Sequence, residues 1–255
     1  MKQRLLPLLT LAALLLGWEA LVRVAQIPHY TLPAPSLVLQ TLFANFGSLA
    51  GSWWFTLKIT FGALALACAG GVLIASVFAL SRTAEAALLP IAVVLQVTPI
   101  VAIAPLILIY VESTTAALLL CAWIVAFFPI LSNTVIGLRA ADPNLRDLYR
   151  LYRATPWQRL RLLLVPSALP YFIAGLKVSG GLSLIGAVTA EMVAGAAGRE
   201  TGLASRILEA SFRSETPKMF AALLLLVLTG VLIFWSFEAL SRKLLGRWHA
   251  SERPD

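Results

Sequence analysis

Charged side chains are scarce in this 255-residue sequence: Asp, Glu, Lys and Arg together make up 13% of it, whereas hydrophobic residues make up 60%. A soluble domain is usually about one quarter charged. The apolar residues fall into long runs, and about 20 helical residues suffice to cross the ~30 Å hydrocarbon core of a bilayer. The scarcity of charge therefore argues against a soluble protein, and the long runs predict an all-α integral membrane protein.

Residues that build catalytic and metal sites are also few. The sequence contains two Cys and two His. Cys68 and Cys121 lie within apolar runs, where small buried hydrophobes are expected, and His29 and His249 stand far apart in the chain. The HExxH pattern, a Cys cluster and the phosphate-binding pattern G-x-x-x-x-G-K-[ST] are all missing from the sequence. We therefore expect no catalytic residues, no metal site and no cofactor, and nothing supports an intramembrane enzyme.

The apolar runs predict six membrane-spanning helices in a single transmembrane domain of residues 1–255. The predicted spans cover roughly residues 5–25, 54–80, 87–110, 115–138, 168–190 and 219–241. The first run begins like a signal peptide, but Glu19 and Arg23 lie where a cleavage site would be expected. An uncleaved first span is therefore predicted. An even number of spans returns both termini to the same side of the membrane.

Basic residues decide the predicted orientation. Most Lys and Arg residues lie near the termini, in the turn at residues 81–86 and in residues 139–166. Because basic segments stay on the cytoplasmic side, both termini and residues 139–166 are predicted to be cytoplasmic, as in a multi-pass protein of the bacterial inner membrane. The net charge of +8 would also suit a nucleic-acid-binding protein. Basic residues beside apolar runs are better explained by anchoring against anionic lipid, so we expect the bilayer and no nucleic acid as a partner.

Two longer segments are predicted on the outer side. Residues 26–53 begin with "IPHYTLPAPS", whose prolines forbid a continuous helix, and Ser36 is expected to cap a short amphipathic helix, "LVLQTLFANF", along the interface. Residues 192–218 mix small residues with charges that include Arg199 and Glu200. They are expected to form an exposed loop that contains a short helix.

The most polar stretch of the chain is residues 139–166, called here the arginine-rich insert. Its arginines are Arg139, Arg146, Arg150, Arg153, Arg159 and Arg161. Thr155, Pro156 and Gln158 match a capping box, in which side chains bind the free amides of a new helix. We therefore expect one helix over 143–153, ending near Arg153 or Ala154, and a second that begins at Pro156.

Apolar residues recur at helical spacing in both predicted helices of the insert. They are Leu148, Leu151 and Tyr152 in the first helix, and Leu160, Leu163 and Leu164 in the second. One face of each helix can therefore be buried, and such short helices need a partner surface to be stable. A charged loop resting on headgroups is the alternative, but the capped corner and the apolar stripe favour a docking element. Pro166 and Pro170 are expected to interrupt or reorient the second helix where the fifth span starts.

The insert resembles the EAA loop of binding-protein-dependent ABC importer permeases, whose pattern is E-A-A, three residues, G, nine residues and I-x-L-P. The matching positions are, in order, Asp147, Leu148, Tyr149, Arg153, Leu163, Val165 and Pro166. The spacing is intact, whereas Tyr149 departs from Ala and Arg153 departs from Gly. These departures bear on the geometry of the corner and on its partner surface, although Thr155 and Pro156 can supply a turn.

Four further stretches resemble the nitrate/sulfonate/taurine permease family, in the same order. They are "LPAPS", "VTPIVAIAPLILIY", "FFPILSNTVIG" and "LPYFIAGLKVSGGLSLIGAVTAE". The resemblance covers roughly residues 28–241. It implies the MetI-like fold of type I ABC importer permeases, with six transmembrane helices and a cytoplasmic coupling-helix loop. It also implies a homodimer, two copies of an ABC ATPase subunit that hydrolyse the ATP, and an extracytoplasmic binding protein that delivers the solute.

By this resemblance, the insert contacts the ATPase subunit and transmits its closure to the spans. A rigid capped helix gripped by a partner can supply the contacts that differ between two states. The residues to which the resemblance and the predicted corner assign this coupling are Asp147, Leu148, Tyr149, Arg153, Ala154, Thr155, Pro156, Trp157, Gln158, Leu160, Leu163 and Pro166.

Three residues within the spans are candidates for the translocation path. Glu191 closes the fifth span, where the resemblance also places an acidic residue, and an ionisable group in a membrane span is a functional candidate. A solvated residue at the helix end is the equal alternative. Asn133 could line the path, but an interhelical hydrogen bond is the commoner explanation. Pro99, together with Pro105 and Pro129, is expected to kink the third and fourth spans.

Other residues of the fifth span have simpler expected roles. Lys177 could extend its ammonium toward the cytoplasmic interface or face the pore, and the first is favoured. The glycines Gly175, Gly180, Gly181 and Gly186 are expected to permit close helix packing. An autonomous secondary transporter is the alternative function, but it would be expected to show internal repeats and several buried carboxylates. The transported solute, which ranges in this family over nitrate, sulfonates, taurine and vitamin-precursor rings, is not selected by the sequence.

Overall fold

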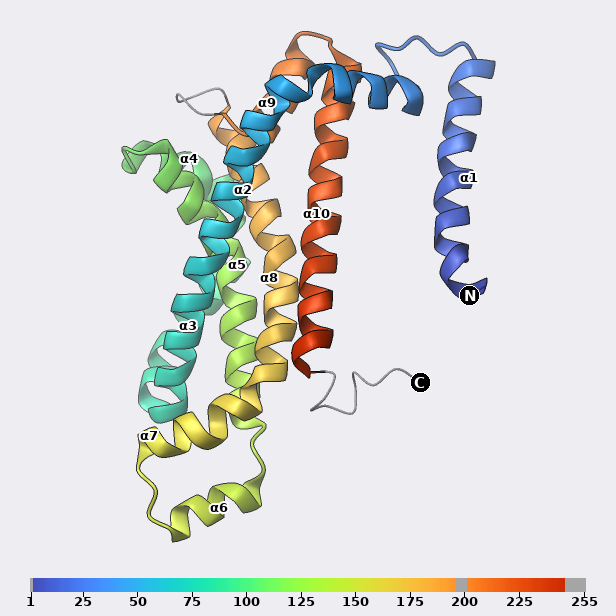
Figure 1. The fold of residues 1–255 in the computed structure, drawn as a ribbon. Coiled ribbons are helices and arrows are strands. Elements are labelled where there is room, and N and C mark those ends of the chain that lie inside the picture. The colour runs from blue at the N-terminus through green and yellow to red at the C-terminus, as the bar shows by residue number, and fades with distance from the viewer. Residues whose placement is uncertain (1, 196–200, 246–255) are drawn as a thin grey trace. The chain divides into compact units, whose positions relative to one another are not determined.

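The computed structural model describes residues 2–195 and 201–245 and contains only helices there, with no strand in these two ranges (Figure 1). Five of the described helices are long and apolar enough to cross a membrane, or six if a pair of shorter helices joined at a bend counts as one span. The elements are α1 (Lys2–Val24), α2 (Pro35–Leu80), α3 (Arg82–Val97), α4 (Ile100–Tyr110), α5 (Thr114–Arg139), α6 (Pro143–Leu151), α7 (Pro156–Arg159), a π-helical turn (Leu160–Leu164), α8 (Val165–Ala194), α9 (Leu203–Phe212) and α10 (Thr216–Leu245). The all-α membrane fold predicted from the sequence is confirmed.

The chain divides into two compact units. One unit comprises Met1–Phe55 and Gly195–Leu228, and the other comprises Thr56–Ala194 and Thr229–Asp255. The arginine-rich insert and the α5–α8 pair belong wholly to the second unit. The single transmembrane domain of residues 1–255 stays a prediction.

The start of α2 corrects one prediction. The predicted interfacial helix from Ser36 is not a separate element, because α2 is continuous over 46 residues. After Pro35 this helix contains no proline that would remove a backbone hydrogen bond. Ser36 also does not cap the helix with its own side chain; its N–H and hydroxyl donate to the Glu19 carboxylate of α1 over 3.0 and 2.7 Å. A negative charge from α1 thus lies at the positive N-terminal end of α2.

The predicted third span is broken at Pro99. Helices α3 and α4 meet at an angle of 102°. Pro99 has no N–H to donate and keeps Thr98 extended, at φ −73° and ψ 123°, so the helix ends there and restarts at Ile100. Pro105 and Pro129, in contrast, lie inside α4 and α5, which continue through them. Of the three expected disruptions, the one at Pro99 separates two helices.

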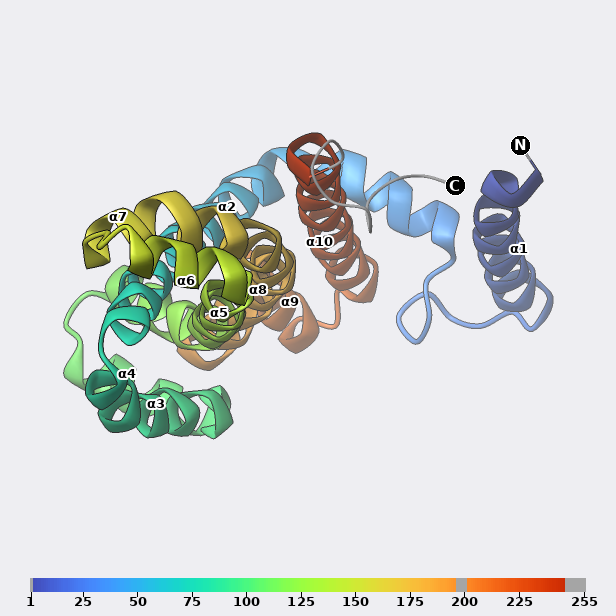
Figure 2. The same ribbon diagram turned by 90° about the horizontal axis from the view of Figure 1, so that it is seen from below.

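Helices α5 and α8 lie side by side along their length, as Figures 1 and 2 both show. Of the four glycines expected at close contacts, Gly175 and Gly186 permit this approach, Gly180 lies against Phe237 of α10, and a Cβ on Gly181 would meet nothing within 4 Å. A Cβ atom on Gly175 would lie 2.8 Å from the Pro129 carbonyl oxygen, and one on Gly186 would lie 2.9 Å from the Cα atom of Ala122. The hydroxyl of Ser179 also donates to the Ala126 carbonyl over 2.7 Å. Within a single chain, small residues thus bring the two backbones into contact.

An ion pair joins α8 to α10. The Lys177 ammonium lies 2.9 Å from the Glu238 carboxylate, and both side chains are less than one quarter exposed. Lys177, expected to extend toward the cytoplasmic interface or to face the pore, thus meets a carboxylate on the neighbouring helix. Its position relative to the membrane stays a prediction. Glu238 also accepts a hydrogen bond from Arg242, one turn farther along α10. Charges within membrane spans are commonly paired in this way.

Candidate functional site

The arginine-rich insert is fixed to α5 by an arginine. Its first helix, α6, is capped by Asp142, whose carboxylate accepts a hydrogen bond from the Asn144 N–H over 2.7 Å. One turn later, the Arg146 guanidinium donates to the carbonyls of Leu138 and Arg139 over 3.1 and 2.6 Å. These carbonyls belong to the last turn of α5. A cation is favourable there because the C-terminal end of a helix carries the negative partial charge of the helix dipole. Arg146 was not assigned a role from the sequence, in which one arginine among several carries no distinguishing signal.

The corner after α6 keeps a conformation that glycine favours, although an arginine occupies it. Arg153 has φ +49°, in the left-handed region. Its N–H donates to the Arg150 carbonyl, and the Ala154 N–H donates to the Tyr149 carbonyl, both over 2.9 Å. These are the two bonds of a Schellman motif with Arg153 in the glycine position. The departure from glycine in the EAA-like pattern therefore leaves the backbone corner intact and adds a side chain to it.

The predicted capping box is confirmed. The Gln158 N–H donates to the Thr155 hydroxyl over 3.3 Å, and the Thr155 N–H donates to the Gln158 side-chain carbonyl over 2.8 Å. Pro156 takes the first helical position, where its missing N–H costs nothing. The side chain of Trp157, the next residue, is 65% exposed. The corner is thus defined on both sides, by the Schellman motif before it and the capping box after it.

Of the two alternatives expected of Pro166 and Pro170, the second helix is not interrupted, but Figure 1 shows that it changes direction between α7 and α8. From Pro156 to Ala194 the chain is one helical stretch of 39 residues. The strain of Pro166 is taken up by the preceding π-helical turn, in which the Val165 N–H donates to the Leu160 carbonyl. Pro166 cannot donate to the Leu162 carbonyl, and a widened turn moves that carbonyl away from the proline ring. The second half of the insert is therefore continuous with α8.

The second half of the insert packs into the hydrophobic core of its own chain. Leu160 and Leu163 are each 5% exposed, and they belong to one core cluster with Leu131 and Leu138 of α5. The expectation that Leu160 and Leu163 face an ATPase is corrected by this packing, because they have almost no surface to offer. The spacing of these leucines correctly indicates a buried face, and that face is covered by α5 of the same chain.

The first half of the insert leaves its apolar face open. Leu145, Leu148, Tyr149 and Tyr152 follow the i, i+3, i+4, i+7 spacing of one helix face. Leu148 is 44% exposed and Tyr152 is 80% exposed. A groove of about 330 Å³, called here the insert groove, separates this face from the second half; its lining residues are Leu148, Tyr149, Tyr152, Ala154, Gln158 and Leu162. Four of these were predicted coupling residues, and Tyr152 and Leu162 were not.

Asp147, the acidic residue of the EAA-like pattern, forms an ion pair within α6. Its carboxylate lies 3.1 Å from the Arg150 guanidinium, and both side chains are 67% exposed. Such an exposed pair contributes little to stability. Asp147 therefore meets a cation of its own helix. A second ion pair in this unit joins Glu85 of α3 to Arg139 at the end of α5.

Glu191, near the end of α8, is buried. It is 1% exposed, and its two carboxylate oxygens lie 2.8 and 3.1 Å from the donating hydroxyl of Thr56 in α2. Thr56 is itself fully buried. The alternative of a solvated residue at the helix end is therefore wrong. Burial of a carboxylate requires hydrogen bonding, which the sequence could not assign because Thr56 lies 135 residues away.

The other two path candidates lie apart from Glu191 in the chain. The Asn133 amide donates to the Pro129 carbonyl of its own helix over 2.8 Å. Its side chain also faces α8, because a Cβ on Gly175 would lie 3.0 Å from the Cβ of Asn133. The expected interhelical hydrogen bond is thus replaced by a bond within α5 at a helix–helix contact. Pro99 is exposed between α3 and α4.

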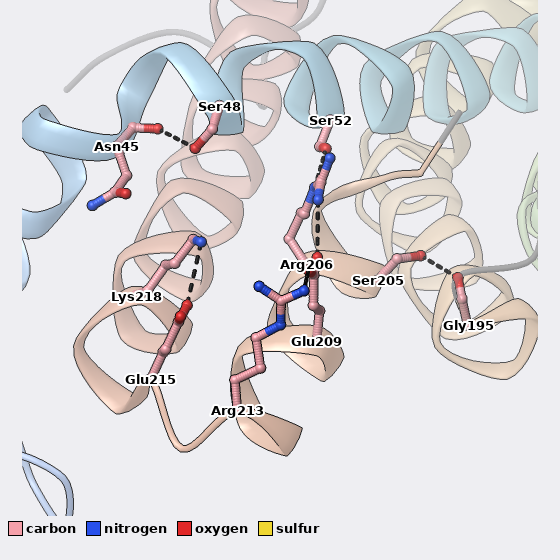
Figure 3. A network of polar contacts seen from close by, with 10 residues as sticks. All are labelled: Asn45, Ser48, Ser52, Gly195, Ser205, Arg206, Glu209, Arg213, Glu215 and Lys218. Atoms are coloured by element: carbon pink, nitrogen blue, oxygen red, sulfur yellow. Dashed lines mark hydrogen bonds and ion pairs between the residues drawn. The ribbon is translucent and has the colours of Figure 1, made fainter. Parts of the chain in front are cut away.

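The described part of the predicted outer loop contains the expected short helix, but this helix is partly buried and joined by polar contacts (Figure 3). Helix α9 buries Leu203 and Ala204, and the Arg206 guanidinium donates to Ser52 of α2 over 3.0 Å. Arg206 and Arg213 also pair with Glu209 over 2.9 and 2.8 Å. The hydrogen bond from Arg206 lowers the pKa of Glu209 from its ordinary value; partial burial opposes this shift, and the nearby positive charges reinforce it. The predicted Arg199 and Glu200 lie outside the described residues.

Residues 67–246 match the model of a protein family described as "Binding-protein-dependent transport system inner membrane component". This match includes α3 to α10, the arginine-rich insert and both members of the α5–α8 pair. The chain belongs to this family. The permease is thus a multi-pass membrane component of a transport system, and the family resemblance carried by its EAA-like insert is confirmed.

Relatives that match nearly the full length of this chain support the same family assignment. The permease is 33% identical over 250 residues to a probable ABC transporter permease protein of Haemophilus influenzae, with 96% of this chain and 99% of the relative covered. It is 34% identical over 246 residues to the riboflavin transport system permease protein RibX of Chloroflexus aurantiacus, with 95% and 89% covered. The permease is therefore an ABC transporter permease and not an enzyme.

A solved structure supports the fold. A chain from inward-facing conformations of the MetNI methionine ABC transporter superposes with a TM-score of 0.64 at 20% identity, covering 76% of this chain and 95% of that chain. At such low identity the likeness concerns the fold alone. It confirms the MetI-like fold of type I ABC importer permeases that the sequence predicts.

Proposed function

We propose that this permease is the translocating subunit of an ATP-driven importer. It works as a homodimer, receives a small solute from an extracytoplasmic binding protein, and releases it into the cytoplasm. The arginine-rich insert contacts an ABC ATPase subunit, one for each permease copy. Both termini and the insert lie on the cytoplasmic side, as the distribution of basic residues favours.

The observation that carries this proposal is the attachment of the insert at both ends. Arg146 binds the last carbonyls of α5, and the second half of the insert continues as one helical stretch into α8. Helices α5 and α8 are in turn packed backbone to backbone at Gly175 and Gly186. A force on the insert is therefore passed to two spans together, because neither end contains a flexible linker. Coupling requires an element whose contacts differ between two states, and a rigid insert gripped by an ATPase meets this requirement.

The proposed solute is a small nitrate-, sulfonate- or taurine-like anion, or a vitamin-precursor ring. The relative that is named as a riboflavin permease supports a ring compound as one possibility. Pro99, Asn133 and Glu191 are the proposed residues of the translocation path. Broken helices and polar groups within spans are typical of transport pathways.

Reconstitution tests the function directly. The permease, its ATPase and its binding protein are placed in liposomes, and uptake is measured with and without ATP. Uptake that requires both ATP and the binding protein is expected. Uptake by the permease alone, driven by an ion gradient, would assign the chain to the autonomous secondary transporters instead. A ligand-induced thermal shift of the binding protein, screened over small anions and vitamin-precursor rings, identifies the solute.

The orientation is tested by labelling. Leu151 is 80% exposed on α6, so a cysteine placed there is accessible to a membrane-impermeant thiol reagent. We expect labelling in inside-out vesicles and none in intact cells, with Cys68 and Cys121 replaced by Ala to remove the native thiols. Labelling in intact cells would contradict the cytoplasmic insert.

A further inference from the structure

The insert groove exposes apolar side chains on a concave surface. Leu148 and Tyr152 line it from α6, and Leu162 lines it from the π-helical turn. The nine-residue α6 is too short to be stable by itself; Arg146 binds it to α5, and Tyr149 packs partly buried against the core cluster. Leu148 and Tyr152 remain exposed, and exposed apolar residues that line a hollow are typical of an interaction surface. An apolar side chain of a partner would fill this hollow.

The charge beside the groove is positive. Arg153 stands between Tyr152 and Ala154, which both line the groove, and its side chain is exposed. Among the described residues Arg153 has no ionic partner, whereas Arg150 pairs with Asp147 and Arg146 binds the end of α5. Arg159 and Arg161 of the insert also form no ion pair within the described residues, but Arg153 is the one with a groove-lining residue on each side of it in the sequence. Its guanidinium is therefore the charge best placed for a partner. A carboxylate is its complement.

The conformation of Arg153 indicates that its side chain has a role. Its φ of +49° is unfavourable for a residue with a Cβ, and glycine would adopt it without steric cost. The stability of the corner therefore does not explain the arginine. Strained residues persist where their side chains serve a function, and this exposed arginine stands between two residues that line the groove.

We infer that the insert groove receives an apolar or aromatic side chain of the ATPase subunit, beside which a carboxylate of that subunit pairs with Arg153. This inference rests on the proposed function and adds the chemistry of the contact. The insert then receives a side chain of the ATPase subunit in addition to transmitting its movement.

The chain offers a matched pair of variants for a test. Leu148→Ala removes a side chain that lines the groove, and Leu151→Ala removes the same side chain from an exposed position of the same helix that does not line it. The full-length permease is placed in nanodiscs, and binding of its purified ATPase subunit is measured by titration. Leu148→Ala is expected to weaken binding by about tenfold or more, as for a buried contact at an interface centre, and Leu151→Ala by less than about twofold.

Arg153→Gly separates binding from folding. Because glycine suits the corner, this variant is expected to melt at the same or a higher temperature than the wild type, and yet to bind the ATPase about fivefold more weakly. The dependence of binding on salt concentration should also become less steep, since one ion pair is lost. A loss of affinity that accompanies a higher melting temperature cannot come from misfolding.

Each result decides between distinct conclusions. If the wild type binds no ATPase, both the proposed function and this inference are wrong. If the wild type binds but Leu148→Ala and Arg153→Gly bind as tightly as Leu151→Ala, only the groove assignment is wrong. If instead those two variants lose binding to vesicles of anionic phospholipid and keep the ATPase, the groove contacts headgroups and the inference is overturned.

Discussion

The two halves of the arginine-rich insert have similar compositions and opposite environments. Both alternate leucines with arginines, but Leu160 and Leu163 are 5% exposed, whereas Leu148 is 44% and Leu151 is 80% exposed. The second half lies against α5 of its own chain, and α6 reaches α5 through the guanidinium of Arg146. The same apolar periodicity thus describes a core face in one half and an open face in the other. The difference lies in what the rest of the chain places beside each helix.

The largest expected effect comes from a charge placed in each half. Leu163→Asp would bury a carboxylate in the α5–α8 core without a partner and should destabilise the protein by about 3–5 kcal/mol, or prevent folding. Leu151→Asp, on the exposed side of α6, should change stability by less than about 0.5 kcal/mol. Thermal melting of the two purified variants in detergent measures both. Equal melting temperatures would contradict the distinction between the halves.

Removal of Arg146, which binds α6 to the end of α5, should have the next largest effect. Arg146→Ala leaves the last carbonyls of α5 without their charged donor and should cost about 1.5–3 kcal/mol locally. Hydrogen exchange at the amides of α6 should accelerate, while the amides of the second half keep their protection. Arg150→Ala is the control, because it removes only an exposed ion pair and should cost less than about 0.5 kcal/mol.

The capping box gives a smaller effect in the second half. Thr155→Ala removes the hydroxyl that accepts from the Gln158 N–H and should cost about 1 kcal/mol. Thr155→Ser keeps the hydroxyl and should restore most of the loss. Hydrogen exchange at the amide of Gln158 reports the change. Unchanged protection in Thr155→Ala would show that the cap does not stabilise this helix.

The smallest effect should be a gain in stability. Arg153→Gly relieves a left-handed conformation that costs a residue with a Cβ about 1–2 kcal/mol, and the greater freedom of glycine in the unfolded chain offsets part of this. A net gain of about 0.5–1 kcal/mol is expected. Arg153→Ala keeps the Cβ and should not show the gain. Melting temperatures of both variants provide the measurement.

Local features of the insert were predictable because the residues that make them are neighbours. Thr155, Pro156 and Gln158 satisfy a capping box within four positions, and the helix break at Pro99 follows from the chemistry of proline. The continuity of α2 was missed, because an interfacial helix and the first turns of a long helix share the same amphipathic sequence. The π-helical turn before Pro166 was also missed, since such a turn has no sequence pattern of its own.

Pairings between distant residues were not predictable. Lys177 was expected to reach the interface, and its partner Glu238 is 61 residues farther along the chain. Thr56, the hydroxyl beside Glu191, had no distinguishing feature in the sequence. The contact of Arg146 with the end of α5 was likewise not predictable, because Arg146 is one arginine among several in the insert.

The sequence by itself determined that this chain is helical and membrane-embedded, where its corner turns, and to which family it is similar. These properties depend on composition, on local hydrogen-bonding chemistry and on the spacing of motifs, which a linear sequence contains in full. The tertiary structure alone decided which leucines of the insert are core and which form an open groove. Burial depends on what distant segments place beside a helix, and side chains of the same type at the same spacing carry no record of that neighbour.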